Sequence, residues 1–247
     1  MEFDSNGVRL HYEMHGPVLG APVVLVHGFA SSYRLNWVGT RWQETLTGAG
    51  FRIIGLDCRG HGESEKPHDE SEYSVAIMAA DVVRLLDHLD VHAAHLVGFS
   101  MGARIGLQVV LDSPPRVTRA VLGGIGIGGA TQRAEAIAEA FLTGRPSGDP
   151  IAQSFYRFAS ALPTNDLRAL AACMIGFKVR YSQAALSAIR TPILLVVGDR
   201  DDIAGDADGL VEWIPTARLV TVAGRDHLGT VPAREFKTAA VDFLTAE

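Results

Sequence analysis

The sequence lacks the features that would direct it to a charged polymer or a membrane. Among 247 residues there are 22 basic and 28 acidic side chains, and the basic ones form no cluster. A formal charge of −6 without a Lys/Arg patch argues against nucleic acid and anionic membrane surfaces as partners. No run of 18 apolar residues occurs, so no membrane-spanning helix is expected. We therefore expect neither kind of partner.

Cysteines and targeting signals are also scarce. Cys58 and Cys173 are the only two cysteines, and their wide separation matches no metal-binding motif, so we expect unpaired structural thiols. The first residues include Glu2, Asp4 and Arg9 and form no apolar signal-peptide core. The expected location is therefore the cytoplasm.

Neither a metal nor an organic cofactor is indicated. His88, His92 and His95 are closely spaced, but they straddle a predicted helix end and the start of a buried strand, so a shared metal-binding face is not expected. The glycine run 123–129 opens no predicted helix after a strand and lacks the downstream acidic residue of a dinucleotide-binding loop.

The stretch most informative about function is Gly98-Phe99-Ser100-Met101-Gly102. An apolar run leads into Gly98, and the residues after Gly102 have helical apolar spacing, which together predict a strand, a sharp turn and a helix. In this G-x-S-x-G pattern the small flanking residues let strand and helix approach closely, and the serine lies on the strained turn. Ser100 is thus a candidate nucleophile at a helix N-terminus, where backbone N–H groups can hold an oxyanion.

Strand and helix patterns alternate along most of the chain and predict an α/β fold with one large core. Asn6-Gly7 between two strand-like runs predicts an N-terminal β-hairpin. Continuous apolar runs predict buried parallel strands, and amphipathic spacing predicts helices. The strands are expected at 22–26, 51–56, 94–98, 117–122, 192–197 and 217–222, and the helices at 37–47, 75–89, 103–110 and 232–244. We expect a mostly parallel central sheet covered by helices on both faces.

A helical segment interrupts this alternation. Only helical patterns are found in residues 125–189, a stretch too long for an ordinary crossover. The predicted division is a core of residues 1–124 and 190–247 with a helical cap, residues 125–189, inserted in it. The glycine run 123–129 is a candidate hinge, and a loop with no gating role is the alternative.

Polar residues follow the last two strands as well. The sequence Gly198-Asp199-Arg200-Asp201-Asp202 follows one strand, and Asp226-His227 follows the next. Since active sites lie at the carboxyl ends of parallel strands, these side chains are expected near Ser100. Imidazole ionises near neutral pH, so His227 is the candidate base that takes the serine proton.

Four motifs in order carry a family resemblance. They are HGF at 27–29, DCRGHGES at 57–64, GFSMG at 98–102, and GDRDD at 198–202 with DH at 226–227. The sequence resembles the α/β-hydrolase fold superfamily, in particular its small capped esterases, enol-lactonases and cofactor-free haloperoxidase or perhydrolase relatives. The order Ser, Asp, His is the one these nucleophile-elbow enzymes use. In this family the cap usually selects the substrate, and we identify no motif in this cap segment.

The resemblance implies a catalytic triad of Ser100, Asp201 and His227. Family members commonly place the acid third after the glycine, as G-x-x-D, which selects Asp201. The acid holds the imidazole in the right tautomer and stabilises the cation that forms. Asp202 and then Asp199 are the alternatives.

The resemblance also implies two oxyanion donors, the backbone N–H groups of Phe29 and Met101. His27 is expected to orient its turn rather than to act as a second base. Arg59 is expected to brace the loop that contains it, and binding of a substrate carboxylate is the alternative.

The predicted function is therefore a serine hydrolase that cleaves small to medium carboxylic esters or lactones through an acyl-enzyme, without metal or cofactor. A cofactor-free perhydrolase or haloperoxidase-like activity is an alternative on the same fold. A hydrolase-like receptor or regulator with little turnover is the alternative from another functional class. The acyl group, the alcohol group and the oligomeric state are not specified by the sequence.

Overall fold

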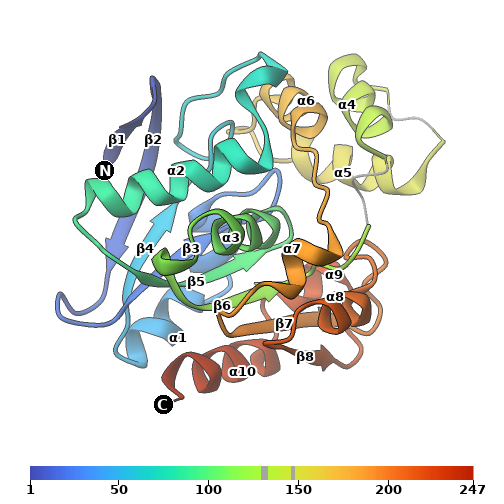
Figure 1. The fold of residues 1–247 in the computed structure, drawn as a ribbon. Helices are drawn as coiled ribbons and strands as arrows, with labels where there is room; N and C mark the ends of the chain where they lie inside the picture. Colours follow the sequence, from blue (N-terminus) through green and yellow to red (C-terminus); the bar gives the residue numbers. More distant parts are fainter. Residues whose placement is uncertain (129–132, 146–147, 247) are drawn as a thin grey trace.

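The computed structural model describes residues 1–128, 133–145 and 148–246 and has an eight-stranded sheet at its centre (Figure 1). The strand order is β1-β2-β4-β3-β5-β6-β7-β8. The β1–β2 and β2–β4 pairs are antiparallel, and all later pairs are parallel. This confirms the predicted α/β fold with its mostly parallel sheet and N-terminal hairpin.

The sheet strands are β1 (Glu2–Ser5), β2 (Val8–His15), β3 (Pro22–Val26), β4 (Arg52–Leu56), β5 (Ala94–Phe99), β6 (Val117–Gly123), β7 (Ile193–Gly198) and β8 (Ala217–Val222). The α-helices are α1 (Trp42–Gly48), α2 (Val75–His88), α3 (Met101–Asp112), α4 (Ala134–Thr143), α5 (Pro150–Ser160), α6 (Leu167–Gly176), α7 (Gln183–Ser187), α8 (Ala207–Trp213), α9 (His227–Thr230) and α10 (Arg234–Thr245). A short π-helix, η1 (Arg34–Val38), and two 3₁₀-helices, η2 (Glu70–Glu72) and η3 (Pro114–Arg116), complete the described elements.

The hairpin turn has the backbone that its sequence predicts. Asn6 and Gly7 have φ angles of 57° and 87°, and Ser5 pairs with Val8 across the turn. Both central residues of a two-residue type I′ turn need a positive φ, which Asn and Gly tolerate best. The two residues therefore close the hairpin without the strain that other side chains would add.

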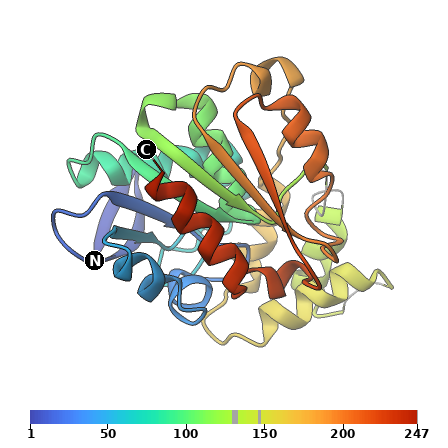
Figure 2. The same cartoon turned by 90° about the horizontal axis from the view of Figure 1, so that it is seen from below.

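Helices bury both faces of the sheet, as its continuous apolar strands predict. On β3, Val24 and Val26 belong to one core cluster, together with residues of α2, α3 and α8. Val23 and Leu25 belong to the opposite cluster, with residues of α1 and α10. Figure 2 shows α10 crossing this second face. Because successive side chains of a strand point to opposite faces, each central strand contributes to two cores.

The continuous helix predicted for residues 37–47 is wrong. The π-helix η1 ends at Val38, residues 39–41 form a turn, and α1 begins only at Trp42. Arg41 between them has a left-handed φ of 65°, which a continuing helix does not accept. The break lets Trp37 and Trp42 meet edge to face, with ring centroids 5.4 Å apart, so burial of the two indoles outweighs helix continuity. The short helix α8 was not predicted.

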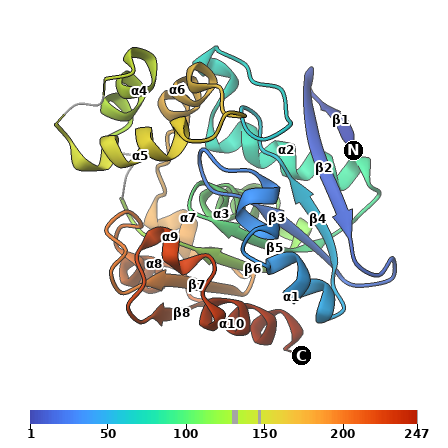
Figure 3. The same cartoon turned by 180° about the vertical axis from the view of Figure 1, so that it is seen from behind.

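Helices α4, α5 and α6 gather on one side of the molecule (Figures 1 and 3). Their apolar side chains, including Ile137, Phe141 and Leu170, form a cluster with Ala30, which follows the carboxyl end of β3. Helix α7 instead packs near α8. Its Leu186 belongs to the core cluster that contains Val24 and Val26. The division into a core and a cap of residues 125–189 stays a prediction. Gly129, at the end of the candidate hinge, lies outside the described residues.

Two expectations from the composition concern the thiols and membrane helices. Cys58 and Cys173 are both buried and free, as expected of structural thiols. Among the helices in the described ranges, none is long and apolar enough to cross a membrane.

We expect Phe236→Ala to lower the free energy of unfolding by about 3–5 kcal/mol, because the ring is fully buried against Trp42 and Phe99. Urea denaturation measures the change. Leu142→Ala is the matched control, since Leu142 is 62% exposed, and it is expected to change stability by less than about 0.5 kcal/mol. Equal losses in the two variants would contradict this account of the core.

Candidate active site

Ser100 lies on a sharp turn between β5 and α3. Its φ of 53° and ψ of −112° are outside the regions that a non-glycine residue normally adopts, so the surrounding structure must hold the strain. A side chain at Gly98 would collide with the carbonyl of Gly102, and one at Gly102 would collide with the carbonyl of Val26. Both glycines are therefore required for the close approach of β5, α3 and β3.

The structure brings Ser100, His227 and Asp201 into one chain of hydrogen bonds. The Nε2 atom of His227 lies 2.9 Å from Ser100 Oγ, and its Nδ1 atom lies 2.8 Å from Asp201 Oδ2. A carboxylate can only accept, so Nδ1 carries the proton and Nε2 is left to accept the serine O–H. The three residues follow β5, β8 and β7, so parallel strand ends position them.

The two other acids of this loop, Asp199 and Asp202, do not contact His227 in the described structure. Asp199 Oδ1 accepts a hydrogen bond from the backbone N–H of Gly224, 2.7 Å away, and Asp202 is exposed. Of the three acids, Asp201 is the one that contacts His227. The G-x-x-D spacing thus selects the carboxylate that the structure brings to the imidazole.

The Asp201 carboxylate is buried and surrounded by donors. Besides His227, the backbone N–H groups of Ile203 and Ala204 donate to its Oδ1 atom at 3.0 and 2.9 Å. Burial acts to raise the pKa of Asp201, but the hydrogen bond and charge of His227 and the two amides outweigh it and lower the pKa. Asp201 is therefore ionised at neutral pH and fixed in place.

His27 fixes the turn that carries Phe29. The backbone N–H of Cys58 donates to His27 Nε2 at 3.0 Å, so the ring proton is on Nδ1, which donates to the carbonyl of Gly28 at 2.7 Å. That carbonyl and the Phe29 N–H belong to one planar peptide group and point in opposite directions. Burial lowers the pKa of His27 and keeps the ring neutral. These contacts are those of an orienting residue, as expected.

Asn36 completes this turn and was missed by the sequence reasoning. Its Oδ1 atom accepts a hydrogen bond from the N–H of Gly28 at 3.0 Å. Phe29 and Met101 line the same small cavity beside Ser100. Their role as oxyanion donors stays a prediction. No local motif marks Asn36, because its role depends on a contact with Gly28 eight residues earlier.

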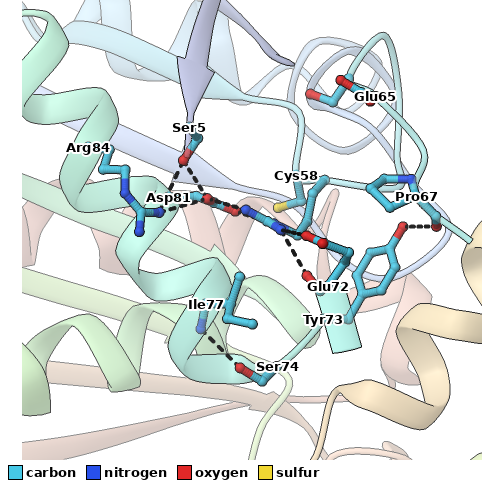
Figure 4. Close-up of polar contacts among 12 residues, drawn as sticks. Ser5, Cys58, Glu65, Pro67, Glu72, Tyr73, Ser74, Ile77, Asp81 and Arg84 are labelled. Atoms are coloured by element: carbon cyan, nitrogen blue, oxygen red, sulfur yellow. Dashed lines mark hydrogen bonds and ion pairs between the residues drawn. The ribbon is translucent and has the colours of Figure 1, made fainter. Parts of the chain in front are cut away.

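Arg59 is occupied by structural ion pairs. Its Nε and Nη2 atoms donate to Asp81 at 2.7 and 2.8 Å, and its Nη1 atom donates to Glu72. Figure 4 shows Ser5 and Arg84 contacting the same Asp81 carboxylate. This supports the bracing role expected for Arg59. It contradicts the alternative that Arg59 binds a substrate carboxylate, because the charge of Arg59 is already paired with the carboxylates of Asp81 and Glu72.

Two cavities open beside Ser100. The larger encloses about 950 Å³ including its open mouth and is mostly apolar, with Phe158, Leu228 and Val231 among its walls. The smaller encloses about 510 Å³ and is lined by Met101, Arg104, Gly124, Met174 and Phe177. Phe29, Ser100, Phe155 and Ile203 line both cavities. A substrate bound at Ser100 can therefore extend in two directions.

The three closely spaced histidines lie in separate environments. His88 stacks on Phe3, and His95 Nδ1 lies 2.8 Å from the hydroxyl of Thr118. Within residues 1–128, 133–145 and 148–246, no group of three or more His, Cys, Asp or Glu side chains is arranged to hold a metal ion.

A family model described as the alpha/beta hydrolase fold matches residues 21–149, just over half of the chain. The chain belongs to the α/β-hydrolase fold family. The matched segment contains the HGF turn, the DCRGHGES loop and the Ser100 elbow. The family includes hydrolases, and membership confirms the resemblance recognised in the sequence.

Individual relatives support the same assignment. The candidate carbamate hydrolase RutD from Variovorax paradoxus is 42% identical over 116 residues, which are 46% of this chain and 41% of RutD. A hydrolase from Pseudomonas aeruginosa PA01 superposes with a TM-score of 0.83 at 26% identity, covering 100% of this chain and 98% of that one. The enol-lactonase from Burkholderia xenovorans LB400, at 23% identity and a TM-score of 0.80, covers both chains fully and shares the fold.

We expect Asp201→Asn to reduce stability above pH 5 and to matter less as the pH falls. The pKa of Asp201 is lowered in the folded protein, so its stabilising contribution is complete above its unfolded pKa of about 3.9. The contribution is lost as the pH falls through the lower, folded-state value. Urea denaturation of both proteins from pH 7 to pH 3 measures the difference, and a gap that widens on acidification would contradict the assignment.

Proposed function

We propose that the protein is a serine hydrolase of small to medium carboxylic esters or lactones. In this proposal Ser100 is the nucleophile, His227 the general base and acid, and Asp201 the residue that orients His227. The observation that carries it is the hydrogen-bond chain from Asp201 through His227 to Ser100, which ends at a mostly apolar cavity. Helices α4 to α6 form the proposed cap over this cavity.

Acylation begins with proton transfer. As Ser100 Oγ forms a bond to the carbonyl carbon, its proton moves to His227 Nε2, and the carbonyl π electrons move to the oxygen. Collapse of this tetrahedral intermediate breaks the bond to the leaving oxygen, which receives the proton from His227 Nε2. The alcohol departs, and the acyl group stays on Ser100 as an ester.

Deacylation repeats these steps with water. His227 Nε2 takes a proton from the water molecule as its oxygen bonds to the acyl carbon. The second tetrahedral intermediate then expels Ser100 Oγ, which regains the proton from His227. A lactone follows the same course, except that the leaving hydroxyl remains tethered to the released acid.

The proposed oxyanion donors are the backbone N–H groups of Phe29 and Met101. Met101 is the first residue of α3, where the positive end of the helix dipole favours negative charge. His27 supports the Phe29 donor by fixing the Gly28 carbonyl. Loss of one such donor typically weakens transition-state binding by about 3–4 kcal/mol.

We expect the wild-type protein to hydrolyse a short p-nitrophenyl ester, and Ser100→Ala to lower kcat by on the order of 10⁶-fold. Release of p-nitrophenolate measures the rate. A panel of alkyl esters, lactones and aryl carbamates tests the substrate class. Repeating the assays with added hydrogen peroxide as the acyl acceptor separates hydrolase from perhydrolase activity. Stable ligand binding without turnover across this panel would contradict the proposal and favour a receptor.

We expect Asp201→Asn to lower kcat by about 10⁴-fold, because the amide no longer holds the productive tautomer of His227. The matched controls are Asp199→Asn and Asp202→Asn, in which the same chemical change occurs on the same loop away from His227. Both controls should retain activity within a few-fold in the same ester assay. Undiminished turnover by Asp201→Asn would transfer the role to another acid.

A further inference from the structure

The position of His227 distinguishes the two cavities beside Ser100. His227 lines the larger cavity and is not among the described residues that line the smaller one. In the proposed reaction the leaving oxygen must lie within hydrogen-bond distance of His227 Nε2 to receive its proton. The leaving alcohol therefore extends into the larger cavity. The acyl substituent, which projects from the carbonyl carbon away from His227, enters the smaller cavity.

Arg104 lines this acyl cavity. It lies on α3, four residues and about one helical turn after Ser100, and is 7% exposed. Its guanidinium donates to backbone carbonyls of Gly126, Gly128 and Ala204 at 3.4, 2.8 and 3.2 Å. Among the residues that the structure describes, no carboxylate forms an ion pair with it. Arg104 is thus a buried cation held by dipoles alone.

Arg59 provides an internal comparison. Its burial is similar, but its guanidinium is neutralised by the bidentate Asp81 carboxylate. Burying a charge without a counterion is costly, and carbonyl dipoles compensate only part of that cost. Arg104 itself lines the smaller cavity beside Ser100. A ligand that carries its own negative charge would complete the pair there.

The rest of the acyl cavity strengthens this attraction. Its other walls include the apolar side chains of Met101, Met174 and Phe177. These side chains carry no charge that would repel an anion, and they bind water weakly. In such surroundings the interaction between opposite charges is stronger than in water. An arginine binds carboxylates with directional, charge-assisted hydrogen bonds, which fix the position of the acid as well as attract it.

We propose that Arg104 selects substrates whose acyl group carries a second, free carboxylate, such as monoesters of short dicarboxylic acids. This inference rests on the proposed function and assigns the substrate class of the same site. Arg104 is then a specificity-determining residue that binds the free carboxylate of the acyl group. His227 protonates the leaving oxygen of the alcohol group.

The test compares benzyl monoesters of C4 to C6 dicarboxylic acids with benzyl esters of the monocarboxylic acids of equal chain length. We measure kcat/KM for each pair by chromatographic detection of benzyl alcohol. The wild-type protein should prefer at least one charged ester over its neutral partner by about 10- to 100-fold. Arg104→Met should abolish this preference, and Arg104→Lys should retain part of it.

Met174→Leu is the matched control, because it changes an apolar wall of the same cavity without changing charge. It should leave the ratio of charged to neutral rates within about threefold of the wild-type ratio. If Arg104→Met slows both esters equally and leaves the ratio unchanged, Arg104 only ties its three carbonyls together and the inference is wrong.

A measurement on the wild-type protein alone covers the case in which Arg104 variants fail to fold. Dicarboxylates of four to six carbons should inhibit hydrolysis of a neutral p-nitrophenyl ester competitively, at concentrations at least about tenfold lower than monocarboxylates of equal length. Equal inhibition, with neutral esters hydrolysed normally, would overturn this inference and leave the proposed function intact. A wild-type protein inert toward charged and neutral esters alike would overturn the proposed function itself.

Discussion

The close packing of β3, β5 and α3 around Ser100 is the constraint on which the site depends. Two glycines remove the side chains that would separate these backbones, and Ser100 takes a positive φ because the chain must reverse there. The strain is tolerable because the elements on both sides are buried in the two sheet cores. A rigid sheet thus holds a conformation that a surface loop would relax.

The parallel sheet then sets what can meet Ser100. The strands β7 and β8 lie beside one another and end at the same edge, so the turn carrying Asp201 and the turn carrying His227 converge. Hydrogen bonds within the turn complete the alignment. Two backbone amides donate to one oxygen of the Asp201 carboxylate, and the other oxygen contacts the imidazole of His227. The site therefore needs few specific residues beyond those on the turns.

How much could be predicted from the sequence depended on how local each signal was. The hairpin, the buried strands and the elbow were predictable because Asn6-Gly7, apolar runs and G-x-S-x-G fix local backbone chemistry. The break before Trp42 was not, because it arises from tertiary packing of two indoles. Arg104 was also missed, since a charged residue on an amphipathic helix normally indicates a solvated face. Its burial is visible only when the turns after β6 and β7 are placed beside it.

Hydrogen bonds connect the N-terminal hairpin to the turn that His27 orients. Ser5 of the hairpin donates to Asp81, Asp81 holds Arg59, and the N–H of neighbouring Cys58 sets the tautomer of His27. A continuous path of hydrogen bonds and one peptide link thus connects the antiparallel edge of the sheet with the turn after β3. The hairpin is more than a covering for that edge. It is one of the supports of the turn that carries Phe29, the residue whose backbone amide is a proposed oxyanion donor.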